Sequence, residues 1–212
     1  MIQTNDTILF QGDSITDCGR GRADTAANSL GALGQGYPKM IAGRLLRQRP
    51  GDALSILNRG VGGNRIVDLY ARWKSDAINL TPDLISILVG VNDTWHEFGS
   101  QNGVEVDRYE TVYRMLLDLT IDRLPDVKLV LCEPFVLLHG AVTAAWLDEM
   151  AARRDVVKRL AKDYNATFVP FQGAFDDALK SAGPGYWTGD GVHPTVAGHC
   201  LMADTWLKTV CP

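Results

Sequence analysis

The sequence lacks the residue patterns of disulfide-rich and metal-binding proteins. It has only four cysteines, and neither CxxC spacing nor a zinc-ligand pattern occurs. We therefore expect free thiols in a reducing compartment, with a disulfide between Cys200 and Cys211 as the alternative. Cysteines, histidines and carboxylates give no closed ligand set, and the phosphate-binding patterns GxGxxG and GxxxxGKS/T are absent. The sequence therefore predicts neither a metal nor another cofactor.

Long hydrophobic runs and runs of basic residues are also missing. No segment approaches the length of a transmembrane helix, and the N-terminal segment MIQTNDTILF has neither the basic nor the apolar region of a signal peptide. The net charge is −4, from 21 basic and 25 acidic residues. These absences argue against nucleic acid or a membrane as a partner, and they predict a cytoplasmic protein.

The composition is that of an ordinary globular protein, with 46% hydrophobic and 22% charged residues. A length of 212 residues suffices for a large core, and no linker or repeat divides it, so we expect a single domain over residues 1–212. Two connections, 17–36 and 134–145, are long for a compact domain, which indicates functional loops.

Short apolar segments alternate with longer segments of helical periodicity. Several of the apolar segments have no polar alternation, as parallel strands covered on both faces do. The alternation predicts a parallel sheet with right-handed crossovers, an α/β sandwich. The expected strands are 7–10, 54–57, 84–89, 127–132 and 166–171, and the expected helices are 37–49, 65–80, 106–124, 146–164 and 194–210.

Polar or glycine-containing segments follow the first four strands, at the sheet edge where open parallel sheets form their sites. Each segment also has a purely structural interpretation. The glycines can form a tight turn, GVND can cap the next helix, and Ser14 can be an ordinary turn residue. The segments are GDS (12–14), NRGVGGN (58–64), GVND (90–93) and EPF (133–135).

Asp190 and His193 lie three residues apart, just before the last expected helix. In a turn this spacing places both side chains together, so Asp190 can accept the Nδ1–H of His193 and leave Nε2 free as a base. The alternative is that Asp190 caps the helix and His193 has no role. His199, inside the expected helix, is expected to be structural.

Together these segments contain the groups that acyl transfer requires. Ser14 would be the nucleophile, His193 its base, and Asp190 the residue that orients His193. The backbone N–H groups of Ser14 and Gly63 and the side-chain amide of Asn92 would form an oxyanion hole, because all three can donate to a developing negative charge.

Four blocks, GDSIT, NRGVGGN, GVND and DGVHP, resemble in order and spacing the blocks of the SGNH hydrolases, the GDSL esterase/lipase superfamily. The resemblance implies a three-layer, flavodoxin-like α/β/α sandwich with five parallel strands. One departure, isoleucine where the family name has leucine, is conservative. The resemblance assigns the nucleophile, oxyanion, orienting and base roles to Ser14, Gly63, Asn92, Asp190 and His193.

A narrower resemblance is to intracellular acetylxylan esterases of this superfamily. It is carried by GDSITDCGR, LGALGQGY, NRGVGGNRIVDLYARW and GVNDTW. It implies a serine esterase that removes O-acetyl groups from acetylated carbohydrates such as xylo-oligosaccharides, and assembly into a homo-oligomer. Trp95 and Trp187 are the candidate substrate-binding residues, because their rings can stack on a sugar; packing within loops is the alternative.

Two other functions are compatible with the sequence. A thioesterase or lysophospholipase of the same superfamily would need an extended apolar groove, and no long apolar stretch stands beside the site. A non-catalytic carbohydrate-binding module on the same scaffold would be favoured by loss of Ser14, Asn92 or His193, and none is lost.

Overall fold

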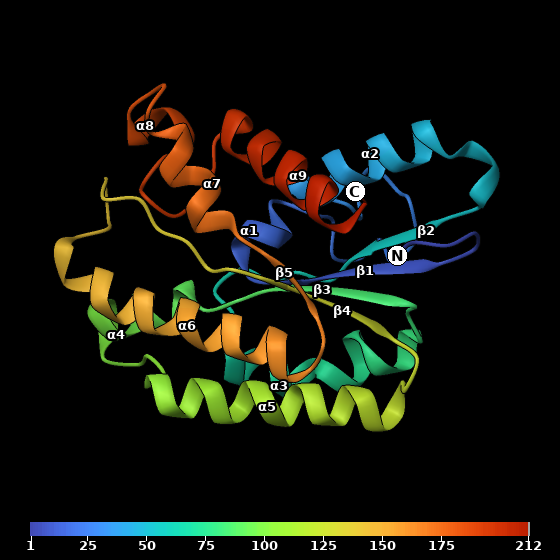
Figure 1. The fold of residues 1–212 in the computed structure, drawn as a ribbon, viewed down its shortest axis with the longest axis horizontal. Helices are drawn as coiled ribbons and strands as arrows, with labels where there is room; N and C mark the ends of the chain where they lie inside the picture. The colour runs from blue at the N-terminus through green and yellow to red at the C-terminus, as the bar shows by residue number, and fades with distance from the viewer. Residues whose placement is uncertain (212) are drawn as a thin grey trace.

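The computed structural model of the protein describes residues 1–211. Five parallel strands form one sheet in the order β2-β1-β3-β4-β5 (Figure 1). Most of their side chains are buried, so the strands need cover on both faces. The strands are β1 (Thr7–Gly12), β2 (Ser55–Asn58), β3 (Leu84–Leu88), β4 (Lys128–Cys132) and β5 (Thr167–Val169).

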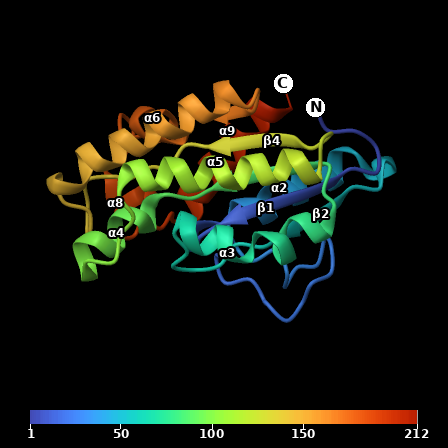
Figure 2. The same ribbon diagram turned by 90° about the horizontal axis from the view of Figure 1, so that it is seen from below.

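Helices cover both faces of the sheet and give the three layers that the resemblance to the SGNH hydrolases implied (Figure 1). The predicted α/β sandwich is confirmed. Helices α4 and α8 lie at the end of the molecule opposite the two termini (Figure 2). One face carries α2 (Tyr37–Gln48), α7 (Phe171–Ala178) and α9 (Val196–Val210). The other face carries α3 (Ile66–Asp76), α5 (Val106–Arg123) and α6 (Leu147–Asp163). The remaining helices are α1 (Ser14–Asp17), α4 (Val91–Ser100) and α8 (Pro184–Trp187).

The core consists of two apolar layers, because successive strand residues point to opposite faces of the sheet. Phe10 joins the layer with α9, where its ring centroid lies 5.4 Å from that of Trp206. Its neighbour Leu9 joins the opposite layer with Trp73, whose indole N–H donates to Thr120 Oγ1 at 2.8 Å. Truncating a buried tryptophan to alanine costs about 3–5 kcal/mol, so both layers are expected to contribute strongly to stability.

The structure differs from the predicted elements at several places where a helix begins. Helix α4 has no counterpart among the predicted helices, because residues 91–93 form its first turn rather than a loop. The predicted strand 166–171 is cut to three residues, since Phe171 already begins α7.

The last helix begins later than the predicted 194–210. Its N-cap is Thr195, whose Oγ1 accepts a hydrogen bond from the backbone N–H of Gly198 at 3.3 Å. Asp190 is therefore not the cap, and its carboxylate is available for other partners. The predicted helix 65–80 likewise splits into α3 and a short 3₁₀ turn at Ile78–Leu80.

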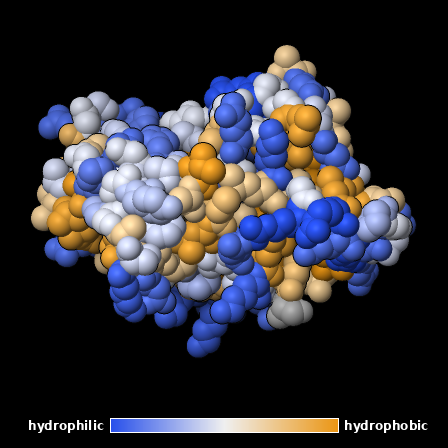
Figure 3. All heavy atoms as spheres, turned by 90° about the horizontal axis from the view of Figure 1, so that it is seen from above, coloured by the Kyte–Doolittle hydropathy of each residue, from blue (hydrophilic) through white to orange (hydrophobic). Residues whose placement is uncertain are grey.

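The cysteines are free thiols, as their spacing in the sequence predicted. All four cysteines, which lie within the described residues, are free, so the Cys200–Cys211 disulfide is wrong. On the face formed by α2, α7 and α9, apolar side chains occur in groups separated by hydrophilic ones (Figure 3). No helix within residues 1–211 is long and apolar enough to cross a bilayer.

The strand order reverses between β1 and β3. The chain leaves β1 for the edge strand β2 and then returns across β1 to form β3. Open α/β sheets bind their ligands at the carboxyl ends of strands at such a switch point. Ser14 follows β1 and Asn92 follows β3, so the topology brings both residues to one crevice.

Candidate active site

Ser14 stands at a sharp turn between the end of β1 and the first residue of α1. The buried carboxylate of Asp13 caps α1 by accepting the backbone N–H of Ile15 at 2.9 Å. Gly12 allows this turn, because a Cβ there would lie 2.2 Å from the carbonyl oxygen of Leu88 in β3. The serine hydroxyl is thereby held at the carboxyl end of the sheet.

Ser14, His193 and Asp190 form a hydrogen-bonded chain. Ser14 Oγ lies 2.9 Å from His193 Nε2, and His193 Nδ1 lies 2.7 Å from Asp190 Oδ2. Since a carboxylate only accepts, Nδ1 carries the proton and Nε2 is left to accept from the serine hydroxyl. This is the order of contacts that a nucleophile, its base and the group orienting that base require.

Asp190 remains ionised because backbone donors surround it. Its Oδ1 accepts the backbone N–H groups of Val192 at 2.9 Å and His193 at 2.8 Å. Partial burial alone would raise the pKa of Asp190, but these two N–H groups and the His193 ring outweigh it, so the pKa is lowered. An ionised carboxylate beside Nδ1 stabilises the protonated form of His193.

The long loop 134–145 supports the backbone that carries Asp190. Leu137 N–H donates to Gly191 O at 2.8 Å, and Ala141 N–H donates to Asp190 O at 2.9 Å. Gly191 has a positive φ of 93°, and a Cβ there would lie 2.3 Å from the carbonyl oxygen of His139. These contacts fix the turn from which Asp190 and His193 project.

The asparagine of GVND adjoins the loop that follows β2. Asn92 is buried in the first turn of α4, and its Nδ2 donates to the carbonyl oxygen of Asn64 at 3.2 Å. Gly62 N–H in turn donates to Asp17 Oδ2 at 3.0 Å, which ties the same loop to α1. Gly63 lies between these two anchors with a φ of 81°, a conformation that favours glycine.

Two buried carboxylates lie behind this site. Burial raises the pKa of Asp13 to about 7, although the backbone N–H of Ile15 and the nearby His193 act against it. Burial also raises the pKa of Asp93 to about 7, although Arg153 and the backbone N–H of Ile66 act against it. Asp93 accepts that N–H at 3.0 Å and so joins the start of α3 to α4.

The structure places the two candidate tryptophans differently. The ring centroid of Trp95 lies 5.8 Å from that of His193. The indole N–H of Trp187 instead donates to Ala182 O at 3.2 Å, and its carbonyl oxygen accepts Thr195 N–H at 2.9 Å. These contacts hold Trp187 against Thr195, the N-cap of α9. That Trp187 binds substrate stays a prediction.

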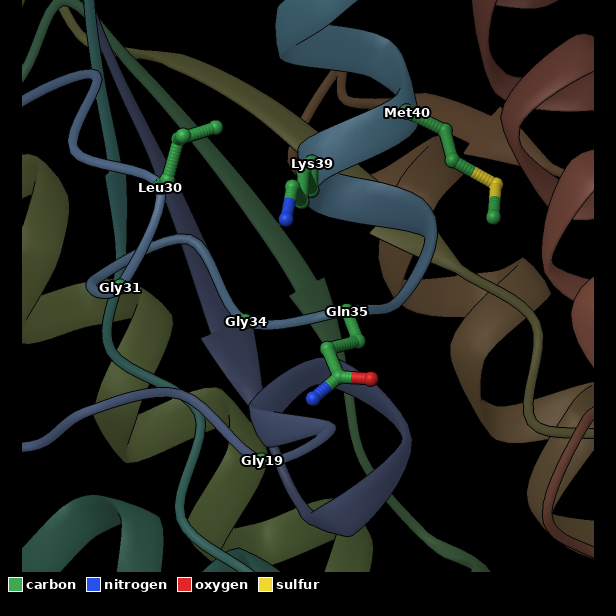
Figure 4. A pocket seen from close by; sticks show the side chains of 7 residues that line it. All are labelled: Gly19, Leu30, Gly31, Gly34, Gln35, Lys39 and Met40. Carbon is green, nitrogen blue, oxygen red and sulfur yellow. The ribbon is translucent and has the colours of Figure 1, made fainter.

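A surface pocket of about 470 Å³, shown in Figure 4, is not lined by Ser14, His193 or Asn92. It opens between the loop after α1 and the start of α2. The pocket is lined by Gly19, Leu30, Gly31, Gly34, Gln35, Lys39 and Met40.

Within the part of the chain that the structure describes, no three His, Cys, Asp or Glu side chains lie close enough together to hold a metal ion.

Comparison with known proteins places this geometry in a family. Residues 10–201 match the GDSL-like lipase/acylhydrolase family. The chain belongs to this family. It is therefore a carboxylic ester hydrolase, and the resemblance to the SGNH hydrolases is confirmed. This GDSL hydrolase is 37% identical over 214 residues to an acetylxylan esterase of Geobacillus stearothermophilus, a match that covers 99% of this chain and 95% of that protein.

Solved structures of GDSL hydrolases share the fold over nearly the whole chain. A protein described as a GDSL-like lipase from Parabacteroides merdae is 41% identical with a TM-score of 0.96, covering 99% of this chain and 97% of that one. The Geobacillus stearothermophilus acetylxylan esterase is 36% identical with a TM-score of 0.91, covering 100% of this chain and 96% of that one. Structures of that esterase include catalytic mutants in which a serine, a histidine or an aspartate is replaced by alanine.

Two aromatic residues close to this site, Phe98 and Trp146, were not among the predicted site residues. Phe98 follows Trp95 by three positions on α4, and Trp146 precedes α6. Residues three apart share a helix face, so the pair at 95 and 98 would have been a usable signal. It was missed because α4 itself was not predicted.

Proposed function

We propose that this GDSL hydrolase is a carbohydrate acetylesterase that removes O-acetyl groups from acetylated xylo-oligosaccharides through an acyl-enzyme on Ser14. The observation that carries the proposal is the hydrogen-bonded chain from Ser14 Oγ through His193 to Asp190. The substrate class is supported by the similarity to an acetylxylan esterase over 99% of this chain.

Attack begins when Ser14 Oγ adds to the acetyl carbonyl carbon. His193 Nε2, 2.9 Å away, takes the hydroxyl proton as the new C–O bond forms. Asp190 holds the tautomer that exposes Nε2 and stabilises the imidazolium. The product of this step is a tetrahedral intermediate whose former carbonyl oxygen carries a negative charge.

Three donors are assigned to that oxyanion: the backbone N–H groups of Ser14 and Gly63 and one amide hydrogen of Asn92. The hydrogen bond from Asn92 to Asn64 uses one of the two hydrogens on Nδ2 and leaves the second for the substrate. Each preorganised donor of this kind stabilises the transition state by about 2.7–4 kcal/mol.

Collapse of the intermediate releases the sugar. The imidazolium of His193 returns its proton to the departing sugar oxygen, and acetate remains esterified to Ser14. A water molecule then repeats the sequence: His193 takes its proton, the water oxygen attacks the ester carbon, and Ser14 leaves with the proton. The sugar oxygen must lie within hydrogen-bond distance of Nε2, so the leaving group occupies the His193 side of the site.

The loop that carries the oxyanion donor Gly63 is polar. Residues 62–65 are Gly-Gly-Asn-Arg. The Arg65 guanidinium donates hydrogen bonds to Asp68 Oδ2 at 2.9 Å and to the carbonyl oxygen of Asn102 at 2.7 Å. A long acyl chain would gain little by burial against these groups, because each buried CH₂ contributes about 0.8 kcal/mol only against apolar surface. An acetyl group needs no such surface.

Acyl-chain length tests the proposal. We expect kcat/KM to fall from 4-nitrophenyl acetate to butyrate and to octanoate, and we expect acetate release from acetylated xylo-oligosaccharides. One poorly fitting methylene is typically worth about 1–3 kcal/mol. A rise from acetate to octanoate without release from the sugar would contradict the proposal and favour a thioesterase or lysophospholipase. Absence of all ester turnover would contradict the proposal and favour a non-catalytic carbohydrate-binding module.

Four further properties are part of the same proposal. An acetylated sugar is the partner, the enzyme acts in the cytoplasm, and it assembles into a homo-oligomer. Turnover needs no metal, because a serine nucleophile and a histidine base suffice for ester hydrolysis. Treatment with EDTA should therefore leave acetate-ester hydrolysis unchanged.

A further inference from the structure

Three aromatic rings that pack against one another extend outward from His193, and we term them the aromatic shelf: Trp95, Phe98 and Trp146. Trp95 lies 5.8 Å from His193 and 5.4 Å from Trp146 between ring centroids. Phe98 stacks on Trp146 at 5.8 Å and 12° between ring planes. Phe98 is 48% exposed, whereas Trp146 is buried, so Phe98 presents a ring to solvent on a rigid base.

The aromatic shelf borders a pocket of about 340 Å³. This volume is near the lower end of the range for small-molecule sites, which is about 300–1,000 Å³. No charged side chain lines it, so it suits a neutral ligand. Its lining residues are Trp95, Phe98, Gly99, Ala141, Thr143 and Trp146.

The pocket is connected to the hydrogen-bonded chain of the active site at two points. On one side Trp95 contacts the His193 ring, and on the other Ala141 N–H donates to the carbonyl oxygen of Asp190 at 2.9 Å. The shelf is thereby held in a fixed position relative to Nε2, the atom that protonates the leaving sugar. Because Trp95 packs against the His193 ring, the shelf adjoins the side of the site that we assign to the leaving group.

We propose that the aromatic shelf is a binding subsite for the sugar unit next to the acetylated one. The inference rests on the proposed function and extends it from a single acetylated sugar to an oligosaccharide. Aromatic rings present an apolar face on which the C–H groups of a pyranose can stack, and Thr143 supplies a hydroxyl at the rim for hydrogen bonding. An uncharged lining matches a neutral xylose unit.

The test compares substrates that differ only in length. Acetate release would be measured from acetylated xylose and acetylated xylotriose with the wild type, Phe98→Ala and Phe98→Tyr. Phe98→Ala should lower the ratio of kcat/KM for the trisaccharide to that for the monosaccharide about three- to tenfold, mainly through KM, and Phe98→Tyr should restore it. Met115→Ala is a matched control, because Met115 on α5 is 46% exposed and lies outside the pocket lining.

A second measurement separates binding from chemistry. Titration calorimetry with unacetylated xylotriose on Ser14→Ala should show binding that weakens when Phe98→Ala is added. Sedimentation of the Phe98→Ala protein would be run beside it. An unchanged ratio of kcat/KM between the two sugars in Phe98→Ala would overturn the subsite. Loss of the oligomeric state in Phe98→Ala would also overturn it, because a second copy of the chain would then be the occupant. A selective loss of butyrate hydrolysis would overturn it as well, because the occupant would then be an acyl chain. Absence of acetate release from either sugar by the wild type would instead contradict the proposed function.

Discussion

Asn92 Nδ2 donates a hydrogen bond to the carbonyl oxygen of Asn64 at 3.2 Å, across two connections that follow different strands. One amide thus joins the start of α4 to the loop that carries Gly63. The hydrogen bond holds the amide plane in a fixed orientation, and the second hydrogen of Nδ2 remains available for the substrate. The relationship makes Asn92 both a brace of the oxyanion loop and a proposed donor.

Replacing Asn92 should affect kcat more than KM. Asn92→Ala removes a donor used chiefly when negative charge develops, so we expect kcat to fall about 10²–10³-fold. Asn92→Asp should be worse, because it places a carboxylate against the oxyanion. Steady-state kinetics with 4-nitrophenyl acetate would measure both, with thermal melting as the control for folding. A rise in KM with unchanged kcat would identify Asn92 as a ground-state binding residue.

Ser14 and His193 should behave as one unit. Ser14→Ala and His193→Ala should each abolish most turnover, and the double variant should be no slower than the worse single variant, because neither group works without the other. The same ester assay with each purified protein measures this. Multiplicative losses in the double variant would show that the two residues act independently.

Asp190→Asn tests the orienting role of the carboxylate with little change of shape. The amide oxygen can still accept the N–H groups of Val192 and His193, but its NH₂ group would face Nδ1 and favour the wrong tautomer. In a serine protease triad the equivalent change lowers kcat about 10⁴-fold, and we expect a loss of similar order. Full activity of Asp190→Asn would exclude tautomer control by this residue.

Asp13 should make stability depend on pH. Burial raises its pKa from 3.8 to about 7, so between these values the folded protein keeps a proton that the unfolded chain releases. The free energy of unfolding should therefore fall as pH rises from about 4 to about 7, by up to about 1.4 kcal/mol per pH unit, and should level off above that window. Asp13→Asn keeps an acceptor for Ile15 and cannot titrate, so its stability should fall less steeply.

Urea unfolding at several pH values across this window measures the slopes of the wild type and Asp13→Asn. Asp126→Asn is the matched control, because Asp126 is exposed, and it should keep the wild-type slope. Two other buried groups contribute equally to both proteins: Asp93, whose pKa burial raises to about 7, lowers the stability as pH rises, and His199, whose pKa burial lowers to about 4, raises it over much of the same range. Identical slopes in the wild type and Asp13→Asn would show that Asp13 is ionised in the folded protein across this range.

Much of the fold was predictable because the spacing of apolar residues along a short segment indicates whether that segment forms a strand or a helix. The segment LISIL, from Leu84 to Leu88, is buried throughout in β3, as its continuous apolar character indicated. The helix predicted over 106–124 is observed as Val106–Arg123. Helix α4 escaped prediction because its first turn contains the polar residues Asn92 and Asp93, a pattern that also suits a loop turn.

The chemistry of the candidate site was also visible in part. Asp190 and His193 are neighbours in sequence, so their contact follows from a short turn, and GDS follows an apolar strand directly. The choice between Trp95 and Trp187 was not visible. Both flank motif residues in the sequence, yet the ring of Trp95 packs at 5.8 Å from that of His193, because α4 begins after β3 and lies beside the turn that holds His193, whereas the indole N–H of Trp187 donates to Ala182 O.

By itself, then, the sequence determined the five strands and most of the long helices, and it placed residue types suited to acyl transfer at the ends of strands, since both patterns depend on neighbours a few positions away. Tertiary structure alone decided that Ser14 meets His193 across 179 residues, that Asn92 braces Asn64, and that Phe98 and Trp146 extend the site. Those contacts depend on the strand order β2-β1-β3-β4-β5, which sets the carboxyl ends of β1 and β3 side by side. Crossover connections fix that order through packing over the whole sheet, which no local pattern records.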